Sequence, residues 1–519
     1  MDPAPHCRNQ RFNRGCAPVR TDAETNKREG VKRKAGIVSL RVYPALAIFC
    51  VAALFTGCNF APHYARPAVE TPATFKENSG TNNTDAAIWQ AAQPNDAVIR
   101  SNWWEIFNDP ALNSLEQQVA ISNQNVVVAF ENFLSAHAIV REAEAEFFPT
   151  AAANPSVMRN RISSGGYSIK SSDPNVTEYE LPLDASWQPD LWGKIRNTVR
   201  AAKGSAQASA ADLENVKLTA QAELASDYFQ LQGQDSLIQL YDDTVNSYSN
   251  SLKLTQVLLK TGIDSGVEVA QAETQLDTTE AEATNLRILR AQLEHAIAVL
   301  LGRPPASFSI PRSALSARPP PIPVALPSQL LERRPDVAAA ERAVYAANAE
   351  IGVGRAAFFP NVTLSASGGY EDPIIGNLFQ WSDRIWSLGA TASQPLFNAG
   401  LPPALAQYRA EYDSAVASYR QTVLSAFQGV EDHLVALRVL KMQIQQQEVA
   451  ADASQKYLNL ALYDFKLGID SYLDVITAQT TLLANRQTLM NLYTEQMEDA
   501  VLLIEDLGGG WDASQLPKN

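Results

Sequence analysis

The apolar residues of this chain recur with two different periods. From Ile195 to Lys260 they return every three or four residues without a break, which predicts a helix about 100 Å long. A second unbroken helical pattern runs from Ala404 to Lys466. Around Tyr179 and Trp386 the period falls to two, as in strands with one apolar and one polar face. The pattern predicts very long helices combined with a few strands.

The first long helix carries two neighbouring apolar stripes. One follows heptad-like spacing and consists of Leu213, Val216, Ala220, Leu224, Tyr228 and Leu231. The other lies beside it and consists of Leu218, Ala222, Ala225 and Phe229. Two adjacent stripes indicate packing on both flanks, as in a ring of helices.

A hexapeptide interrupts both long helical patterns. Lys260–Ser265 reads KTGIDS, and Lys466–Ser471 reads KLGIDS 206 residues later. Gly262 and Gly468 are suited to a left-handed turn, and the Ser that ends each copy is suited to cap the next helix. Each copy therefore predicts the bend of a helical hairpin, with return helices from Val267 to Leu301 and from Tyr472 to Leu507.

The same offset relates other markers, which indicates an internal duplication. Gln188-Pro189 at the end of one strand corresponds to Gln394-Pro395, again 206 residues later. At a slightly larger spacing of 211 residues, Phe-Phe-Pro closes a helix at residues 147–149 and again at 358–360. The first of these helices is expected as one stretch from Trp103 to Phe148. The predicted divisions are a leader (1–57), a lipidated linker (58–100), a first repeat (101–302), a Pro-rich linker (303–327), a second repeat (328–507) and a tail (508–519).

Charge and composition exclude several classes of function. Residues 1–57 hold ten Lys/Arg and four Asp/Glu, which leaves 32 Lys/Arg against 52 Asp/Glu in the rest of the chain. Such an acidic body argues against nucleic acid as a partner. All four Cys lie at or before residue 58, no two of the five His are close in sequence, and paired carboxylates such as Glu280 and Glu282 lie on helix faces. We therefore expect no enzyme activity, no metal site and no cofactor beyond a covalent lipid.

The lipid is expected at Cys58. A basic stretch and an apolar run of fourteen residues precede Thr56-Gly57-Cys58, which resembles a bacterial lipobox. Lipidation of Cys58 would anchor the chain to a membrane, and Asn59 after it favours the outer membrane. The alternative is an ordinary signal peptide with an incidental Cys.

Four strands per chain are too few to close a transmembrane barrel, which needs about eight. If the strands cross a membrane, their edges require neighbouring copies, and three chains would supply twelve strands. The alternative is a small soluble sheet packed on the helices.

Three motifs identify a family. Leu330–Val337 (LLERRPDV), Asp190–Arg196 (DLWGKIR) and Leu507–Trp511 (LGGGW) resemble the pattern of outer-membrane efflux channels of the TolC/NodT type. The resemblance implies a mainly α fold with a membrane β-barrel, in which a homotrimer forms twelve strands and a long periplasmic α-helical barrel. It also implies a periplasmic adaptor, an inner-membrane pump of the RND type, contact with outer-membrane lipid, and a location that spans the outer membrane and extends into the periplasm.

The family's pattern places the hairpin turns at the periplasmic mouth. The resemblance implies a gate formed by Asp474, Asp470 and Glu268, and an adaptor contact formed by Gly262, Ile263, Asp264, Ser265, Gly468, Ile469 and Ser471. The simpler interpretation is that the Asp residues only cap helices. The implied function is the passive exit duct of a tripartite efflux system for small molecules. Two alternatives stay open: the duct of a type I protein secretion system, and a coiled-coil lipoprotein without a pore.

Overall fold

A computed structural model describes residues 59–77, 89–91, 102–161, 175–263, 265–316, 318–324 and 331–517. The chain divides into two units, residues 1–55 and 56–519, and every described residue belongs to the second. Cys58 and Asp264 fall outside the described residues, so the predictions made for them are not examined by the structure.

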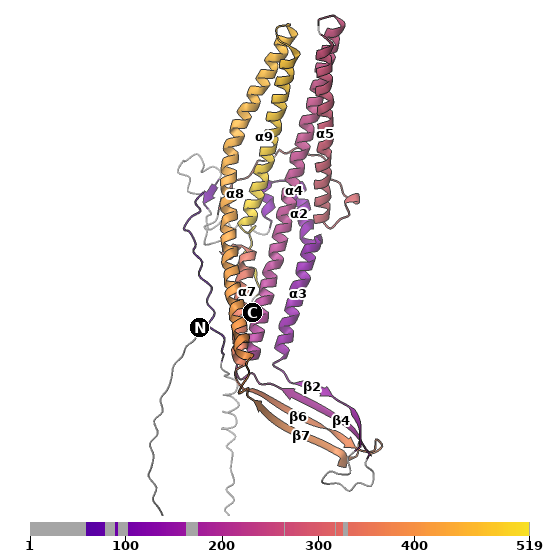
Figure 1. Ribbon diagram of the computed structural model, residues 1–519, viewed down its shortest axis with the longest axis vertical. Coiled ribbons are helices and arrows are strands. Elements are labelled where there is room, and N and C mark those ends of the chain that lie inside the picture. The colour runs from indigo at the N-terminus through magenta and orange to yellow at the C-terminus, as the bar shows by residue number, and fades with distance from the viewer. Residues whose placement is uncertain are drawn as a thin grey trace, which may run out of the picture. The chain divides into compact units, whose positions relative to one another are not determined.

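Two long helical hairpins dominate the described part of the chain (Figure 1). The first joins α4 (Lys194–Lys260) to α5 (Gly266–Leu300), and the second joins α8 (Leu401–Lys466) to α9 (Tyr472–Asp506). The two arms of each hairpin pack together, and α4 also packs against α9 of the other hairpin. The predicted long helices and their turns are confirmed. No helix within the described ranges has an apolar stretch long enough to cross a bilayer.

The start of α8 differs from the prediction. The helix begins at Leu401, before Pro402 and Pro403, rather than at Ala404. Proline is tolerated there because the N–H groups of a first helical turn have no partner within the helix.

The predicted helix from Trp103 to Phe148 is wrong, because the chain breaks it twice. It consists of a 3-10 turn η2 (Trp103–Phe107), α2 (Pro110–Ser122) and α3 (Gln124–Ala145). At the first break Asp109 accepts hydrogen bonds from the first turn of α2. At the second, the side chain of Asn123 caps α3 and its amide donates to the carbonyl oxygen of Leu300 at 2.9 Å. Short polar side chains that cap a new helix therefore override the continuous apolar period.

The strands that follow the shorter helices form one sheet, and they differ in length. Its strands are β2 (Thr150–Ala153), β3 (Ser156–Arg161), β4 (Asn175–Trp187), β6 (Asn361–Asp372) and β7 (Arg384–Ser393), and every pairing is antiparallel. β2 and β3 both pair with β4, so they are two pieces of a single edge interrupted at Asn154-Pro155. The predicted four-stranded arrangement is confirmed, with β2/β3 and β7 at its two edges.

The remaining described elements lie between or beside the helical hairpins and the sheet. A helix α7 (Pro335–Ala356) packs on α4 and α8 and leads into β6. The short strands β1 (Trp89–Ala91) and β5 (Ile322–Val324) pair in parallel, and 3-10 turns lie at η3 (Pro305–Ser307), η4 (Trp381–Asp383) and η5 (Ala513–Gln515). Because β4 ends at Trp187 and α4 begins at Lys194, the sheet lies at the opposite end of α4 from the hairpin turn.

The main core surrounds the middle of α4. Leu224 and Phe229 are fully buried there, together with Leu112 of α2, Ile297 of α5 and Val501 of α9. All of the second predicted stripe is buried, whereas Leu213 and Val216 of the first are only partly buried at its edge. Both stripes therefore pack into the same core within this chain.

Candidate functional site

The two hairpin turns have the same backbone geometry. Gly262 has φ 74° and Gly468 has φ 72°, so both take the left-handed conformation. The N–H of Ile263 donates to the carbonyl of Leu258 at 3.0 Å, and the N–H of Ile469 donates to the carbonyl of Asp464 at 2.9 Å. These bonds close the helix C-terminus in a Schellman motif. Nothing lies within 4 Å of a Cβ built on either glycine, so conformation alone requires them.

After the first turn, Ser265 and Glu268 form a capping box. The N–H of Ser265 donates to Glu268 Oε2 at 3.0 Å, and the N–H of Val267 donates to Ser265 Oγ at 3.2 Å. The Ser265 hydroxyl also donates to Glu268, and these bonds hold the pKa of that carboxyl below its usual range. Glu268 therefore satisfies the start of its own helix.

After the second turn, the arrangement differs. The Ser471 hydroxyl donates to Asp474 Oδ2 at 2.7 Å, and it makes no capping bond to the backbone. Asp474 is half-buried. The cap positions are Ser265 and Ser471, so the interpretation of Asp470 as an N-cap is wrong. Asp470 is exposed and makes no hydrogen bond or ion pair with any residue that the structure describes.

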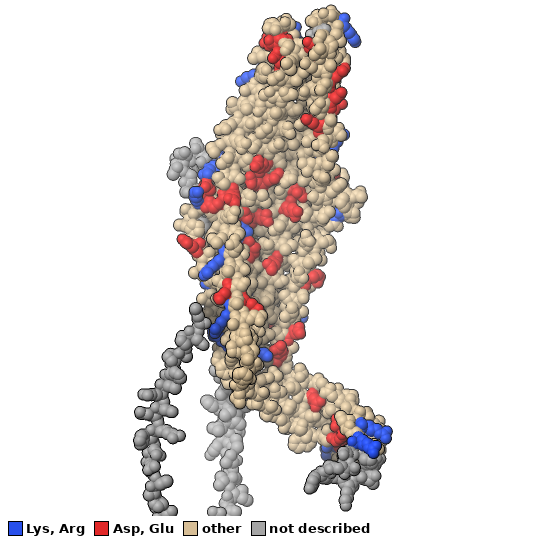
Figure 2. Space-filling model, in the orientation of Figure 1, with Lys and Arg blue, Asp and Glu red and all other residues tan. Residues whose placement is uncertain are grey.

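Apolar side chains project from both turns. Ile263 is 70% exposed and Ile469 is 67% exposed, and Val267, Leu467 and Leu473 beside them are also exposed. Behind them a compact cluster that includes Phe465, Tyr472 and Val475 holds the hairpin ends together. Figure 2 shows acidic and basic side chains scattered around these ends. The turns offer apolar surface on a rigid support.

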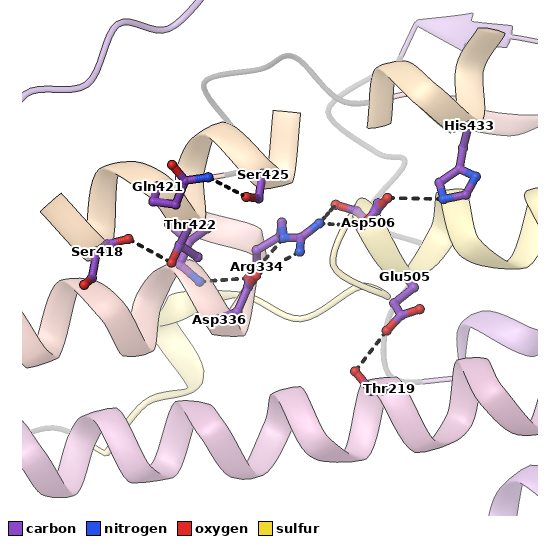
Figure 3. A network of polar contacts seen from close by, with 11 residues as sticks. Thr219, Arg334, Asp336, Ser418, Gln421, Thr422, Ser425, His433, Glu505 and Asp506 are labelled. Atoms are coloured by element: carbon purple, nitrogen blue, oxygen red, sulfur yellow. Dashed lines mark hydrogen bonds and ion pairs between the residues drawn. The ribbon is translucent and has the colours of Figure 1, made fainter. Parts of the chain in front are cut away.

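A polar network ties the second half of the chain together at the other end of α9 (Figure 3). Arg334 donates to Asp336 Oδ2 at 2.8 Å, and to the side chain of Asp506 at 2.8 Å. His433 Nδ1 lies 2.9 Å from Asp499 Oδ1, and its Nε2 lies 3.6 Å from Asp506 Oδ2. Burial lowers the pKa of His433, but the bond to Asp499 and the nearby carboxylates outweigh it and raise the pKa.

This network gives Arg334, the second Arg of the LLERRPDV motif, a structural role. Arg334 immediately precedes α7, while Asp506 ends α9, so one guanidinium joins the first and last helices of the second half. The LLERRPDV motif by itself does not predict this contact. The only signal in the sequence was Arg334-Pro335-Asp336 at the start of a predicted helix.

The segment after Cys58 is fixed along α7. Phe60 stacks on Phe359 with ring centroids 4.3 Å apart, and Arg355 donates to the carbonyl of Phe60 at 3.1 Å. Further along, Arg66 donates to Tyr419 Oη at 3.1 Å. Phe359 lies two residues before β6, so these contacts bring the chain two residues after Cys58 to the junction of helices and sheet.

One carboxylate group among the described residues has the spacing of metal ligands. Oxygen atoms of Glu178, Glu180 and Glu371 lie within 4.8 Å of one another on β4 and β6. With one oxygen from each residue the group supplies three ligands, fewer than the six to eight oxygen ligands typical of calcium. We assign no metal to them.

Comparisons with known proteins agree with this architecture. A family model described as outer membrane efflux protein matches residues 111–303 and 326–509. The probable efflux pump outer membrane protein TtgC of Pseudomonas putida is 32% identical over 470 residues, which cover 90% of this chain and 95% of that protein. The cation efflux system protein CusC of Escherichia coli is 29% identical over 89% of this chain and 98% of that protein.

Solved structures also resemble the chain. The outer-membrane channel OprN superposes with a TM-score of 0.81 at 27% identity, over 88% of this chain and all of that one. The outer membrane protein VceC of Vibrio cholerae superposes with a TM-score of 0.74 at 27% identity, over 79% of this chain and 99% of that one.

Proposed function

The chain belongs to the outer membrane efflux protein family, and from this premise we propose that it is the passive exit duct of a tripartite pump for small molecules. Its channel role in the outer membrane follows from the family. The proposal adds the trimer, the lipid anchor, the adaptor contact and the gate. In this assignment the chain performs no catalytic step, and transport is driven by the inner-membrane pump.

The unpaired edges of the sheet carry the proposal of a trimer. A single chain leaves β2/β3 and β7 without a second neighbour among the described strands. Leu183, Trp386 and Leu388 are 65–78% exposed on this sheet, as expected for an apolar face that needs lipid. Three copies would pair every edge and make twelve strands, whereas one copy would leave unsatisfied backbone groups in the membrane.

The contacts of Phe60 support a lipid anchor at Cys58. They hold the chain at the helix–sheet junction, where a barrel that spans the membrane would meet the periplasmic helices. Acyl chains on Cys58 would enter the bilayer there without stretching the intervening residues. Several acyl chains give stable anchoring, since each buried CH₂ contributes about 0.8 kcal/mol.

The second turn supports a gate. Asp474 stands five residues beyond Ile469, and in a trimer three Asp474 carboxylates would surround one axis. Like charges at close range repel one another and attract cations, which suits a constriction that is selective and can open. Asp470 is exposed beside them, while Glu268 is held in its capping box.

The exposed isoleucines support the adaptor contact. Ile263 and Ile469 occupy equivalent places on the two hairpins, so a trimer would present six such tips in a ring. Apolar residues on rigid turns form a surface that a second helical hairpin can cover.

Reconstitution in planar bilayers tests the channel. The purified, lipidated chain should give discrete conductance steps, whereas a coiled-coil lipoprotein without a pore gives none. Crosslinking through residue 263 or 469 in cells should capture a periplasmic adaptor of an RND pump. Capture of an adaptor that belongs to a protein-secreting transporter would contradict the small-molecule assignment.

A further inference from the structure

An open groove lies on the apolar face of the sheet. The strand register places Leu183 of β4, Gly368 of β6 and Trp386 of β7 side by side in one row, so they share a face. Leu183 and Trp386 are both exposed, and Gly368 between them has no side chain. The groove that these residues line has a volume of about 600 Å³. It therefore has two apolar walls and a floor of backbone.

The two neighbouring glycines of β6 have different reasons to be glycine. A Cβ built on Gly369 would clash with the carbonyl oxygen of Leu181, so the close approach of β4 requires that glycine. A Cβ built on Gly368 has no described atom within 4 Å, and the backbone there has no positive φ. Glycine inside a strand often marks the close approach of another molecule. The floor of the groove is therefore shaped for an occupant outside the chain.

Aromatic rings and a cation close the end of the groove that lies farther from the helices. β6 leaves the helix junction at Asn361 and reaches Tyr370 near its far end, where Tyr370 pairs with Arg384 of β7. The rings of Tyr370 and Phe379 lie 5.6 Å apart, and both residues line the groove. The guanidinium of Arg384 lies over the ring of Trp381, and its Nε donates to the carbonyl of Trp381 at 2.7 Å. Such residues are typical of the boundary between hydrocarbon and lipid headgroups.

The terminal amino groups of Arg384 are available to bind an anion. Neither of them forms a hydrogen bond or an ion pair with a residue that the structure describes. The nearby carboxylates are used elsewhere. Asp372 accepts a hydrogen bond from a backbone N–H of the β6–β7 turn at 2.6 Å, and Asp383 accepts one from a Ser hydroxyl at 2.8 Å.

The other charges at this end of the sheet are divided between its two faces. By their register with β4, Arg159 and Arg161 of β3 lie on the same face as the groove, and both are exposed. The acidic residues Glu178, Glu180 and Glu371 lie on the opposite face. Figure 2 shows basic side chains at this end of the sheet. The face with the groove is thus apolar along its length and basic at its outer end, which suits an anionic lipid.

We propose that the groove binds an acyl chain of a phosphorylated glycolipid from the outer leaflet of the membrane, and that Arg384 binds its phosphate. The inference rests on the proposed barrel, in which this face meets hydrocarbon and the outer end of the sheet meets the outer headgroups. The acyl chain covers Gly368 between Leu183 and Trp386. The two terminal amino groups of Arg384 donate to phosphate oxygens, a paired geometry that suits a guanidinium.

Native mass spectrometry of the purified, lipidated chain tests the headgroup contact, with bisphosphorylated lipid A as the probe. Arg384→Gln removes the cation and should weaken binding of lipid A about fivefold or more. Dephosphorylated lipid A should bind the wild type and Arg384→Gln equally. Arg287→Gln removes an equal charge from an exposed position on α5 and should leave both affinities unchanged. Wild-type affinity for lipid A in Arg384→Gln would overturn the assignment.

A conservative variant separates the headgroup contact from support of the turn. Arg384→Lys keeps the positive charge but cannot reproduce the bond from Nε to the carbonyl of Trp381. Binding of lipid A should therefore persist in Arg384→Lys. Equal losses in Arg384→Lys and Arg384→Gln would show that the arginine only holds the turn in place.

A side chain added at Gly368 tests the groove itself. Gly368→Leu fills the floor without strain, because open space surrounds that position, so lipid A and its dephosphorylated form should both bind about tenfold more weakly. Ser365→Leu adds the same side chain to the opposite face of β6 and should leave binding unchanged. Equal losses in the two variants, or unchanged binding in Gly368→Leu, would overturn the proposal.

The same spectra separate this inference from the proposed trimer. The mass shows whether the chain is a monomer or a trimer, and bound lipid is counted per chain. Monomers that bind lipid A through Arg384 and Gly368 would reject the trimer and support the groove. Trimers whose bound lipid does not depend on these two residues would reject the groove and leave the trimer intact.

Discussion

At the scale of single residues, Glu116 of α2 is an unusual member of the core. It is fully buried, and neither carboxylate oxygen finds a hydrogen-bond partner among the described residues. Burial raises the pKa of Glu116 well above its usual range. The folded chain therefore binds a proton that the unfolded chain loses above a pH of about 4.3, and stability should fall as the pH rises from there toward the folded pKa.

Glu116→Met should stabilise the protein by about 1–3 kcal/mol near neutral pH, because it removes a buried group without partners. The gain should grow as the pH rises from about 4.3 toward the raised pKa of Glu116 in the folded chain, since the wild type loses stability over that range and the variant does not. Thermal denaturation at fixed scan rate measures both effects. Glu131→Met on the exposed face of α3 is the control, and an equal gain there would mean that hydrophobicity alone is responsible.

Asp474 is the residue on which conductance should depend most. In the proposed trimer, Asp474→Ala would remove three like charges from the mouth, so single-channel conductance should rise by about twofold or more and block by cations should weaken. The difference should shrink in 1 M salt, where the Debye length is about 3 Å. Asp277→Ala removes an equal charge from an exposed position on α5 and should change neither property. Unchanged conductance and unchanged cation block in Asp474→Ala would remove it from the gate.

At the scale of elements, the hairpin turns depend on left-handed glycines. Gly468→Val places a β-branched residue at φ 72°, which should cost about 1–2 kcal/mol locally and distort the turn that carries Ile469. Crosslinking to the adaptor and efflux in cells should both decrease. Gly266→Val is the control, because Gly266 starts α5 without a positive φ and has open space around it. Normal crosslinking in Gly468→Val would show that the adaptor does not use this turn.

At the scale of the whole molecule, one face of α3 has no neighbour among the residues that the structure describes. Val127, Phe130 and Leu134 recur at helical spacing and are 38–45% exposed. We expect another copy to cover this stripe, so Leu134→Asp should shift the assembly from trimer to monomer when measured by native mass spectrometry. Ile139→Asp changes an equally apolar residue outside the stripe and should leave the trimer intact. A trimer that survives Leu134→Asp would place the interface elsewhere.

The sequence by itself determined the long helices, their turns and the duplication. Those features depend on local chemistry: unbroken apolar periods, a Gly that permits positive φ, and a Ser that caps the next helix. The hexapeptides gave both turns to the residue, and period-two alternation gave the strands around Tyr179 and Trp386. Where polar caps compete with apolar period, as at Asn123, the sequence pattern alone predicted the wrong element.

Only the tertiary structure decided how the two halves meet. A hydrogen bond joins Arg334 to Asp506, which are 172 residues apart in the chain, and another joins Gln479 to Ser251, which are 228 residues apart. The tertiary structure also buries Glu116 without a hydrogen-bond partner among the described residues. No local period records such contacts, because each depends on which faces of separate helices come together. The same reason explains why Glu268 and Asp474, equivalent in sequence, differ in structure: one completes a capping box, and the other accepts only a Ser hydroxyl.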